Sequence, residues 1–253
     1  MRGLEIFRKH FIGFENCYVV IGGTACSILL DKAGGEFRAT KDVDMVLIVE
    51  NINEMFAMKF WEFIKNGQYI ENYSSQGKAN FYRFENPEND LYPAMIELFT
   101  RSPANLSLSP GSHLLPLHLA DDISSLSAIL LNDDYYNFLL DGKKVVEGVS
   151  ILDEYHLIPF KAKAWCELTD RQDEGEIGLS KHIKKHRKDI ATLLTLVIAN
   201  KTVELKGIVL EDMIRFEKEM RREELTEETI GIKNMTTELY CSQLRIIYCL
   251  SNS

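Results

Sequence analysis

The sequence predicts a mixed α/β unit over residues 1–152, followed by an all-α helical unit over residues 153–253. Two observations support this division. In the first part, short apolar runs typical of buried strands alternate with segments whose apolar residues recur at helical spacing. After about Asp153, long segments repeat at the helical period and no convincing strand follows.

The elements of the first unit follow in a regular order. We expect helices near 4–11, 25–30 and 53–65, strands near 17–21, 42–49, 79–84 and 94–100, and a closing hairpin over 143–152. The segment "GGTA" ends the first strand, and the turn-rich "ENPEND" separates two later ones. In the second unit, the stretches "EYHLIPFKAKAWCELTDRQ", "SKHIKKHRKDIATLLTLVI", "LEDMIRFEKEMRREEL" and "TTELYCSQLRIIYCL" predict a helical bundle.

Composition indicates a soluble chain with enough material for a core, since 45% of its 253 residues are hydrophobic and 26% are charged. The formal net charge of −9 argues against binding a polyanion over the whole surface, but it leaves room for a local basic patch. The start, "MRGLEIFRKHF", interleaves charged and apolar residues, and no apolar run is long enough to span a membrane. Five scattered cysteines show no zinc-ligand spacing. We therefore expect a cytoplasmic protein with reduced thiols and no membrane partner.

Two carboxylates stand at the start of the second strand, in "RATKDVDMVLIV". Because side chains alternate along a strand, Asp42 and Asp44 should point to one face and Val43 to the other. Two carboxylates in this arrangement suit a hard divalent ion such as Mg²⁺. Taken alone, the pair is as often a set of solvated loop acids.

A third acid occurs in the later strand "AMIELFT". Glu97 lies between Ile96 and Leu98, so it should project to the face opposite these apolar neighbours. If the two strands are adjacent, the three acids converge. Three carboxylates can hold two metal ions about 4 Å apart, one activating a hydroxyl and the other stabilising a leaving pyrophosphate.

The stretch "VVIGGTACSILL" places two glycines and a hydroxyl residue between a strand and a helix. Such a turn lets backbone N–H groups at the helix N-terminus approach a phosphate. The same three residues are equally compatible with a simple tight turn.

The order of these segments resembles the polymerase-beta-like nucleotidyltransferase superfamily, which has a glycine turn, an Asp-x-Asp pair and then a third acid. Within that superfamily the chain is similar to the AbiEii-type group of abortive-infection toxins and their relatives. Its "RATKDVD" run matches the Arg-x-Thr-x-Asp-hydrophobic-Asp pattern of that group at Arg38, Thr40, Asp42 and Asp44. "PFKAKAWCELTDR" and "KKHRKDIATLL" resemble a second block of the group, although a longer insertion separates them here.

The resemblance implies a role for each matching position. The nucleotide triphosphate is held by Gly22, Gly23 and Thr24, with Arg38 and Thr40 in the adjoining run. Metal is bound by Asp42, Asp44 and Glu97, the last also being a candidate base. Lys161 is the expected triphosphate lysine, Lys163 is an open alternative, and Asp189 is expected to orient a basic partner rather than bind metal.

The implied activity is the transfer of a nucleoside monophosphate from a nucleoside triphosphate to a hydroxyl or phosphate acceptor, with two Mg²⁺ ions. The resemblance further implies a toxin with a cognate antitoxin, and tRNA as a possible acceptor; a small-molecule acceptor is open too. Two alternatives remain. One is a metal-dependent glycosyltransferase, in which Asp-x-Asp also binds a metal and a sugar nucleotide. The other is a protein that keeps this fold and only binds a partner.

The run "KHIKKHRK" carries five lysines or arginines in eight residues. A run of this kind on an amphipathic helix is most often a solvated face. The alternative is a contact with phosphate or RNA, which needs clustered cations even on an acidic protein.

Overall fold

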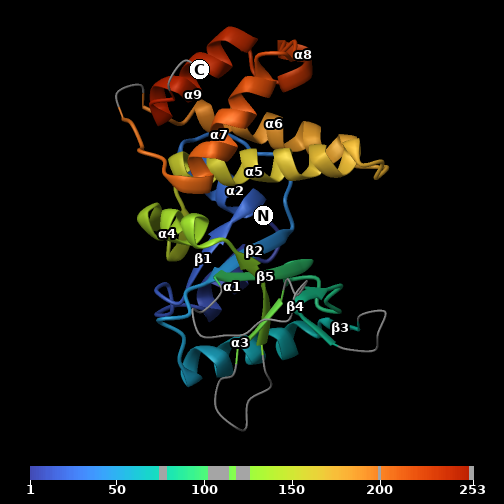
Figure 1. Ribbon diagram of the computed structural model, residues 1–253. Coiled ribbons are helices and arrows are strands. Elements are labelled where there is room, and N and C mark those ends of the chain that lie inside the picture. The colour runs from blue at the N-terminus through green and yellow to red at the C-terminus, as the bar shows by residue number, and fades with distance from the viewer. Residues whose placement is uncertain (74–78, 102–113, 118–125, 199–200, 251–253) are drawn as a thin grey trace. The chain divides into compact units, whose positions relative to one another are not determined.

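The computed structural model describes residues 1–73, 79–101, 114–117, 126–198 and 201–250 (Figure 1). It divides into two compact units, Met1–Leu152 and Asp153–Ser253. The division falls at the boundary given by the sequence. Unit 1 is a mixed α/β structure, as predicted, and every element in the described residues of unit 2 is a helix.

A mixed sheet forms the centre of unit 1. In the described residues its strands are β1 (Tyr18–Ile21), β2 (Asp42–Leu47), β3 (Ile70–Tyr73), β4 (Ala79–Glu85), β5 (Met95–Arg101), β6 (Leu114–Leu117), β7 (Leu126–Leu131), β8 (Lys143–Val146) and β9 (Val149–Leu152). The strand order is β3-β4-β5-β2-β1-β9-β8, and β7 pairs with both β5 and β6. Strand β2 lies at the middle of this order, antiparallel to β1 and parallel to β5.

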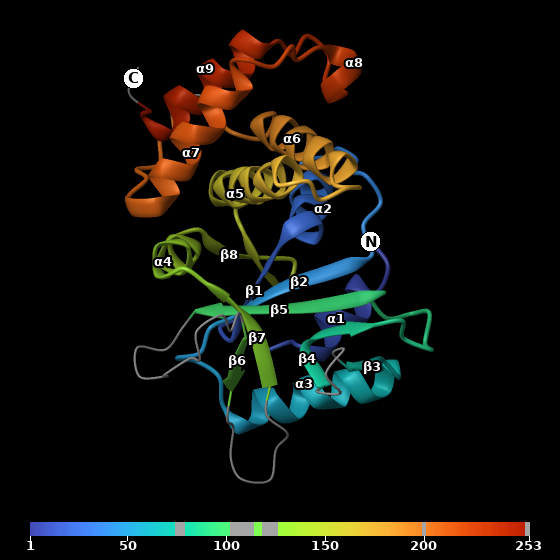
Figure 2. The same cartoon turned by 45° about the vertical axis from the view of Figure 1, so that its right-hand side comes forward.

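Helices cover both faces of the sheet. The described helices of unit 1 are α1 (Leu4–His10), α2 (Gly22–Lys32), α3 (Glu54–Gly67) and α4 (Asp133–Asp141). Helices α1 and α3 lie on one face and α2 on the other (Figure 2). The ring of Phe63 in α3 packs against the rings of both Phe7 and Phe11 in the N-terminal segment. These aromatic rings are fully buried, so the α1–α3 face holds much of the core.

Several elements differ from the sequence prediction. Helix α2 begins at Gly22 rather than at Ala25, because "GGT" forms its first turn instead of a separate loop. Gly22 has φ +68°, a conformation that glycine adopts without the cost a side chain brings, so the chain passes from β1 into the helix directly. The strands β3, β6 and β7 and the helix α4 were not predicted.

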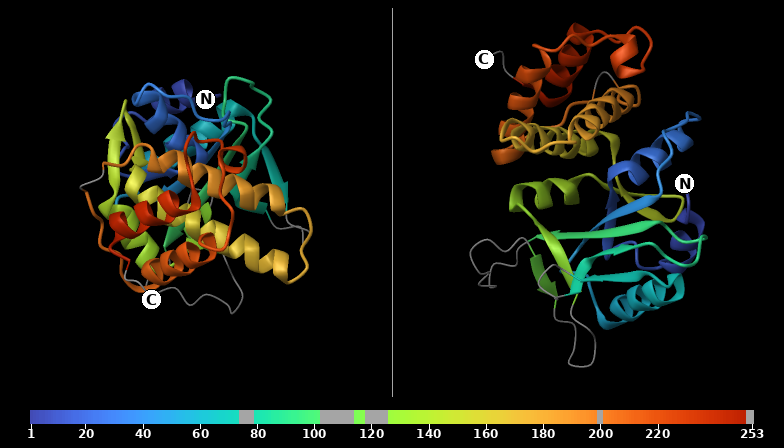
Figure 3. Two further views of the ribbon diagram at one scale, coloured as in Figure 1. Left: turned by 90° about the horizontal axis from the view of Figure 1, so that it is seen from above. Right: turned by 90° about the vertical axis from the view of Figure 1, so that its right-hand side faces the viewer.

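Unit 2 consists of helices in its described part: α5 (Glu154–Asp173), α6 (Ser180–Leu194), α7 (Gly207–Met220), α8 (Glu227–Ile230) and α9 (Thr237–Tyr248). Helix α5 contacts both α6 and α7, and α7 contacts α9 (Figure 3). The side chain of Asp153 caps α5 by accepting the backbone N–H of His156. None of the helices described combines the length and apolar character that crossing a membrane requires.

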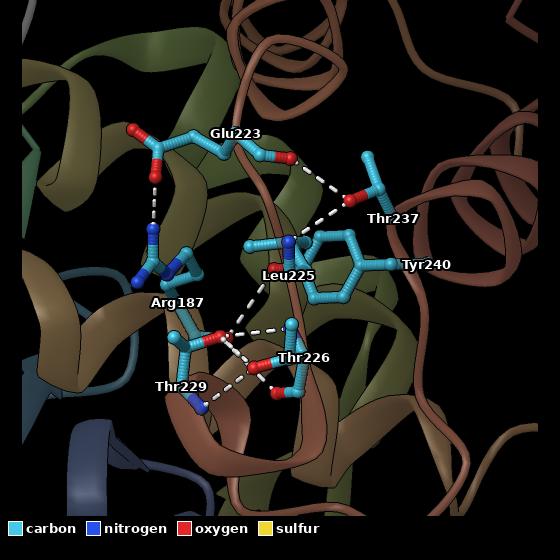
Figure 4. A network of polar contacts seen from close by, with 7 residues as sticks. All are labelled: Arg187, Glu223, Leu225, Thr226, Thr229, Thr237 and Tyr240. Carbon is cyan, nitrogen blue, oxygen red and sulfur yellow. Dashed lines mark hydrogen bonds and ion pairs between the residues drawn. The ribbon is translucent and has the colours of Figure 1, made fainter.

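A network of polar contacts joins α6 to the segments around α8 and α9 (Figure 4). Arg187 of α6 is buried and forms an ion pair with Glu223. The hydroxyl of Tyr240 donates to the backbone carbonyl of Arg187, and the hydroxyl of Thr237 donates to that of Glu223. This network fixes the helix that carries the basic run of the sequence.

Candidate functional site

The two strands that carry the predicted acids are neighbours in the sheet. Strands β2 and β5 run parallel, with Asp44 opposite Glu97 and Val43 opposite Ile96. Ile96 is also opposite Phe84, whose ring packs against Phe60 in α3. Because successive side chains alternate faces, the apolar residues face α3 and the acids lie on the other face, as the sequence predicts.

The glycine turn at Gly22 and Gly23 lies against the side chain of Asp44. A Cβ atom added to Gly22 would lie 1.9 Å from Oδ2 of Asp44. A Cβ atom added to Gly23 would lie 3.0 Å from Oγ1 of Thr40 and 3.3 Å from Nη2 of Arg38. The turn, the run 38–40 and the start of β2 therefore come together, although they are separate in the sequence.

The side chain of Thr24 has a structural role. It is fully buried, and its hydroxyl donates to the backbone carbonyl of Asp42 at 2.5 Å. The expectation that this residue holds the triphosphate therefore does not apply to its hydroxyl, which instead ties the first turn of α2 to the start of β2. The hydroxyl forms this bond because it is buried where α2 packs on β2, and a buried hydroxyl needs a hydrogen-bond partner.

We expect the two glycines to respond differently to substitution. Gly22→Ala places a side chain in the left-handed region and against the Asp44 carboxylate, so it should lower the free energy of unfolding by about 1–3 kcal/mol. Gly23→Ala meets only side-chain atoms that can shift, so it should fold normally but bind nucleoside triphosphates less well. Urea unfolding and equilibrium titration with each triphosphate measure the two effects. Unchanged nucleotide binding in Gly23→Ala would mean that the turn is only structural.

A three-acid metal site is not assembled in the described residues, where no group of three or more His, Cys, Asp or Glu side chains is placed to hold a metal ion. Glu97 is instead paired with Arg83, whose Nη2 and Nε atoms lie 2.6 and 3.0 Å from its Oε1. Glu97 lies opposite Asp44 on the neighbouring strand, and its predicted part in metal binding stays a prediction. Two carboxylates on one strand remain a donor set that suits Mg²⁺.

The second block of predicted residues lies in unit 2 and contains a buried ion pair. Nζ of Lys161 in α5 lies 2.8 Å from Oδ2 of Asp189 in α6, and the two residues are 4% and 2% exposed. Asp189 thus engages a basic partner, as expected from the resemblance. The interaction also joins the two helices.

Lys163 belongs to a different set of contacts. Its ammonium lies 2.9 Å from Glu167 and 3.6 Å from Asp212 of α7. Partial burial alone would lower the pKa of Lys163, but the hydrogen bonds and charges of Glu167 and Asp212 raise it above its ordinary value. Lys161 and Lys163 therefore face different helices, as their spacing predicts.

Four exposed lysines line one face of α6. They occur at positions i, i+3, i+4 and i+7, namely Lys181, Lys184, Lys185 and Lys188. Arg187 points away from this face, since it is buried in the ion pair with Glu223. In the part of the chain that is described, no carboxylate forms an ion pair with Lys181, Lys184 or Lys188. We call these four residues the α6 lysine face.

No protein-family model matches the chain, and no curated protein matches it at a significant level.

Proposed function

We propose that the protein is a magnesium-dependent nucleotidyltransferase, which moves a nucleoside monophosphate from a nucleoside triphosphate to a hydroxyl or phosphate acceptor. The observation that carries this proposal is the meeting of the Gly22–Gly23 turn, the run 38–40 and the Asp42–Asp44 pair on one face of a mixed sheet. A glycine turn for phosphates beside a carboxylate pair for a cation is the combination that a metal–triphosphate complex needs.

Each part has a chemical task in this proposal. Among the described residues, no side chain caps the N-terminus of α2, so its first backbone N–H groups are suited to phosphate oxygens, and Arg38 adds a positive charge nearby. Asp42 and Asp44 supply oxygen ligands to the cation. Bound Mg²⁺ supplies charge neutralisation for the triphosphate and for the departing pyrophosphate. Glu97 accepts the proton of the acceptor hydroxyl. The resemblance to the AbiEii-type group is the reason for proposing that Lys161 or Lys163 binds the triphosphate.

The acceptor we propose is RNA, with tRNA as the first candidate, in a toxin that is controlled by an antitoxin. The α6 lysine face supports an RNA acceptor, because clustered cations contact a phosphodiester backbone even when the protein carries a net negative charge. The toxin role rests on the resemblance to the AbiEii-type group.

A second candidate is a protein of this fold that binds a partner without catalysis. It is favoured by the Arg83–Glu97 pair, which occupies one oxygen of the third acid, and by the lack of a three-acid cluster in the described residues. A glycosyltransferase is less well supported, since that chemistry does not require a glycine turn against the acid pair.

Label transfer tests these candidates directly. The protein is incubated with Mg²⁺, total cellular RNA and each triphosphate labelled at the α-phosphate, and with labelled nucleotide sugars in parallel. We expect one or more triphosphates to label the RNA with release of pyrophosphate. Sugar transfer would support the glycosyltransferase, and binding without any transfer would support the non-catalytic protein.

Charge reversal on the α6 lysine face should weaken RNA binding. In Lys184→Glu/Lys188→Glu, the affinity for a fluorescent tRNA should fall, and the slope of log K against log salt should decrease by about 2, because each phosphate-contacting lysine contributes about 1. The matched control is Lys218→Glu/Lys233→Glu, which changes the net charge equally at exposed positions of the same unit. Equal effects in both variants would show that only the total charge matters.

A further inference from the structure

Arg83 and Glu97 face each other across two antiparallel strands. Strand β4 pairs with β5 so that the two residues are directly opposite. Both nitrogens of Arg83 that bond Glu97 donate to the same oxygen, Oε1, at 2.6 Å from Nη2 and 3.0 Å from Nε. A guanidinium usually spreads two bonds over both oxygens of a carboxylate, so this arrangement treats the two oxygens differently.

The second oxygen of Glu97 is left for another ligand. Within the described residues, Oε2 accepts no hydrogen bond, and the Glu97 side chain is 13% exposed. Partial burial alone would lower the pKa of Arg83, but the hydrogen bonds and charge of Glu97 raise it. Arg83 therefore stays a cation beside the carboxylate. Its two hydrogen bonds to Oε1 fix the orientation of the Glu97 carboxylate.

We propose that Arg83 is a positioning residue for Glu97, which holds Oε1 and thereby presents Oε2 on the sheet face that carries Asp44. This inference rests on the proposed nucleotidyltransferase function. In that reaction the acceptor oxygen forms a bond to the α-phosphorus, the bond from that phosphorus to pyrophosphate breaks, and the acceptor proton passes to Oε2. The proton then leaves to solvent, and Arg83 keeps its bonds to Oε1 throughout.

A double-mutant cycle with Arg83→Met and Glu97→Gln tests this inference. We expect Arg83→Met to lower kcat about 10- to 100-fold, less than the full contribution of about 100- to 10,000-fold that a general base can make. The KM for the triphosphate should stay within about twofold of its original value, since neither residue is proposed to hold the triphosphate. Because Arg83 acts through Glu97, the double variant should be no slower than Glu97→Gln alone.

Two further measurements separate positioning from a general structural role. Added guanidinium ion should partly restore kcat in Arg83→Met, and Arg83→Lys should show an intermediate kcat because it keeps the charge but not the fork. Binding of Mn²⁺, followed by electron paramagnetic resonance, should not weaken in Arg83→Met, because the change removes a positive charge from the sheet that carries the Asp42–Asp44 pair and removes no proposed metal ligand.

The control is Arg101→Met. Arg101 lies on the same strand as Glu97, is 34% exposed, and pairs with Glu50 at 2.6 Å, so its loss should leave kcat unchanged. Unchanged kcat in Arg83→Met, or additive losses in the double variant, would overturn the inference. Higher kcat together with tighter Mn²⁺ binding would overturn it too, by showing that Arg83 blocks Glu97. Absence of transfer by the unmodified protein would instead overturn the proposed function itself.

Discussion

Asp44→Asn is expected to lower the kcat of metal-dependent nucleotide transfer by about 1,000-fold. The amide keeps the shape of the side chain against Gly22 but removes the charge that attracts the cation. A metal ion contributes several kcal/mol of transition-state stabilisation, and each loss of about 1.4 kcal/mol is a factor of ten in rate. Label transfer measures the loss, and Mn²⁺ binding should weaken in parallel. Asp42→Asn should change both quantities in the same direction.

Asp141→Asn serves as the control for this experiment. It removes one carboxylate from an exposed position at the end of α4, so it changes the net charge by the same amount outside the site. Transfer and Mn²⁺ affinity should be unaffected. If Asp44→Asn retained both, the carboxylate pair would not be a metal site.

Lys161→Met is expected to lower the free energy of unfolding of the protein by about 3–5 kcal/mol. The substitution removes the ammonium that pairs with the buried Asp189 carboxylate, and a buried charge deprived of its partner is strongly destabilising. Urea unfolding measures the change. Lys163→Met should cost less, since Lys163 is 29% exposed and water can solvate the carboxylates that it leaves.

A compensated variant separates the structural role of Lys161 from its proposed role in triphosphate binding. Lys161→Met/Asp189→Leu replaces the buried ion pair by apolar side chains, so most of the lost stability should return. If this variant is folded but inactive, the ammonium is needed for the chemistry. If it is folded and active, the pair is structural, and Lys163 becomes the remaining candidate. A single substitution at Lys161 gives no such distinction, because unfolding alone would remove activity.

Much of the unit 1 sheet could be predicted from the sequence because its central strands are short, apolar and bounded by turn residues. The apolar run of β7 was not predicted, since a run of this length is compatible with either a strand or a buried helix. Pro116 lies within β6, and proline argues against a strand unless it is at an edge or a bulge. Helix α4 has a visible signal in the capping Asn132 followed by two aspartates, a pattern typical of a helix N-terminus.

The sequence could predict those features of the candidate site that depend on the alternation of side chains along a strand. The period of two places Asp42 and Asp44 on one face and Glu97 on the corresponding face of its own strand. The partner of Glu97 could not be predicted, because it depends on the register between β4 and β5, which the connecting turn sets. The burial of Thr24 likewise follows from the packing of α2 on β2, a tertiary contact that a turn motif does not specify.

The hydrogen bond from Thr24 to the Asp42 carbonyl holds the glycine turn and the acid pair together in the absence of a ligand. It closes a segment of 18 residues and joins the helix start to the start of the acid-bearing strand. The conformational entropy cost of bringing these two segments together is therefore met when unit 1 folds. Ligand binding does not add this cost a second time. For the proposed nucleotide site, we therefore expect that the turn and the acids need no rearrangement before binding, and that the apparent affinity is not reduced by a small population of binding-competent molecules.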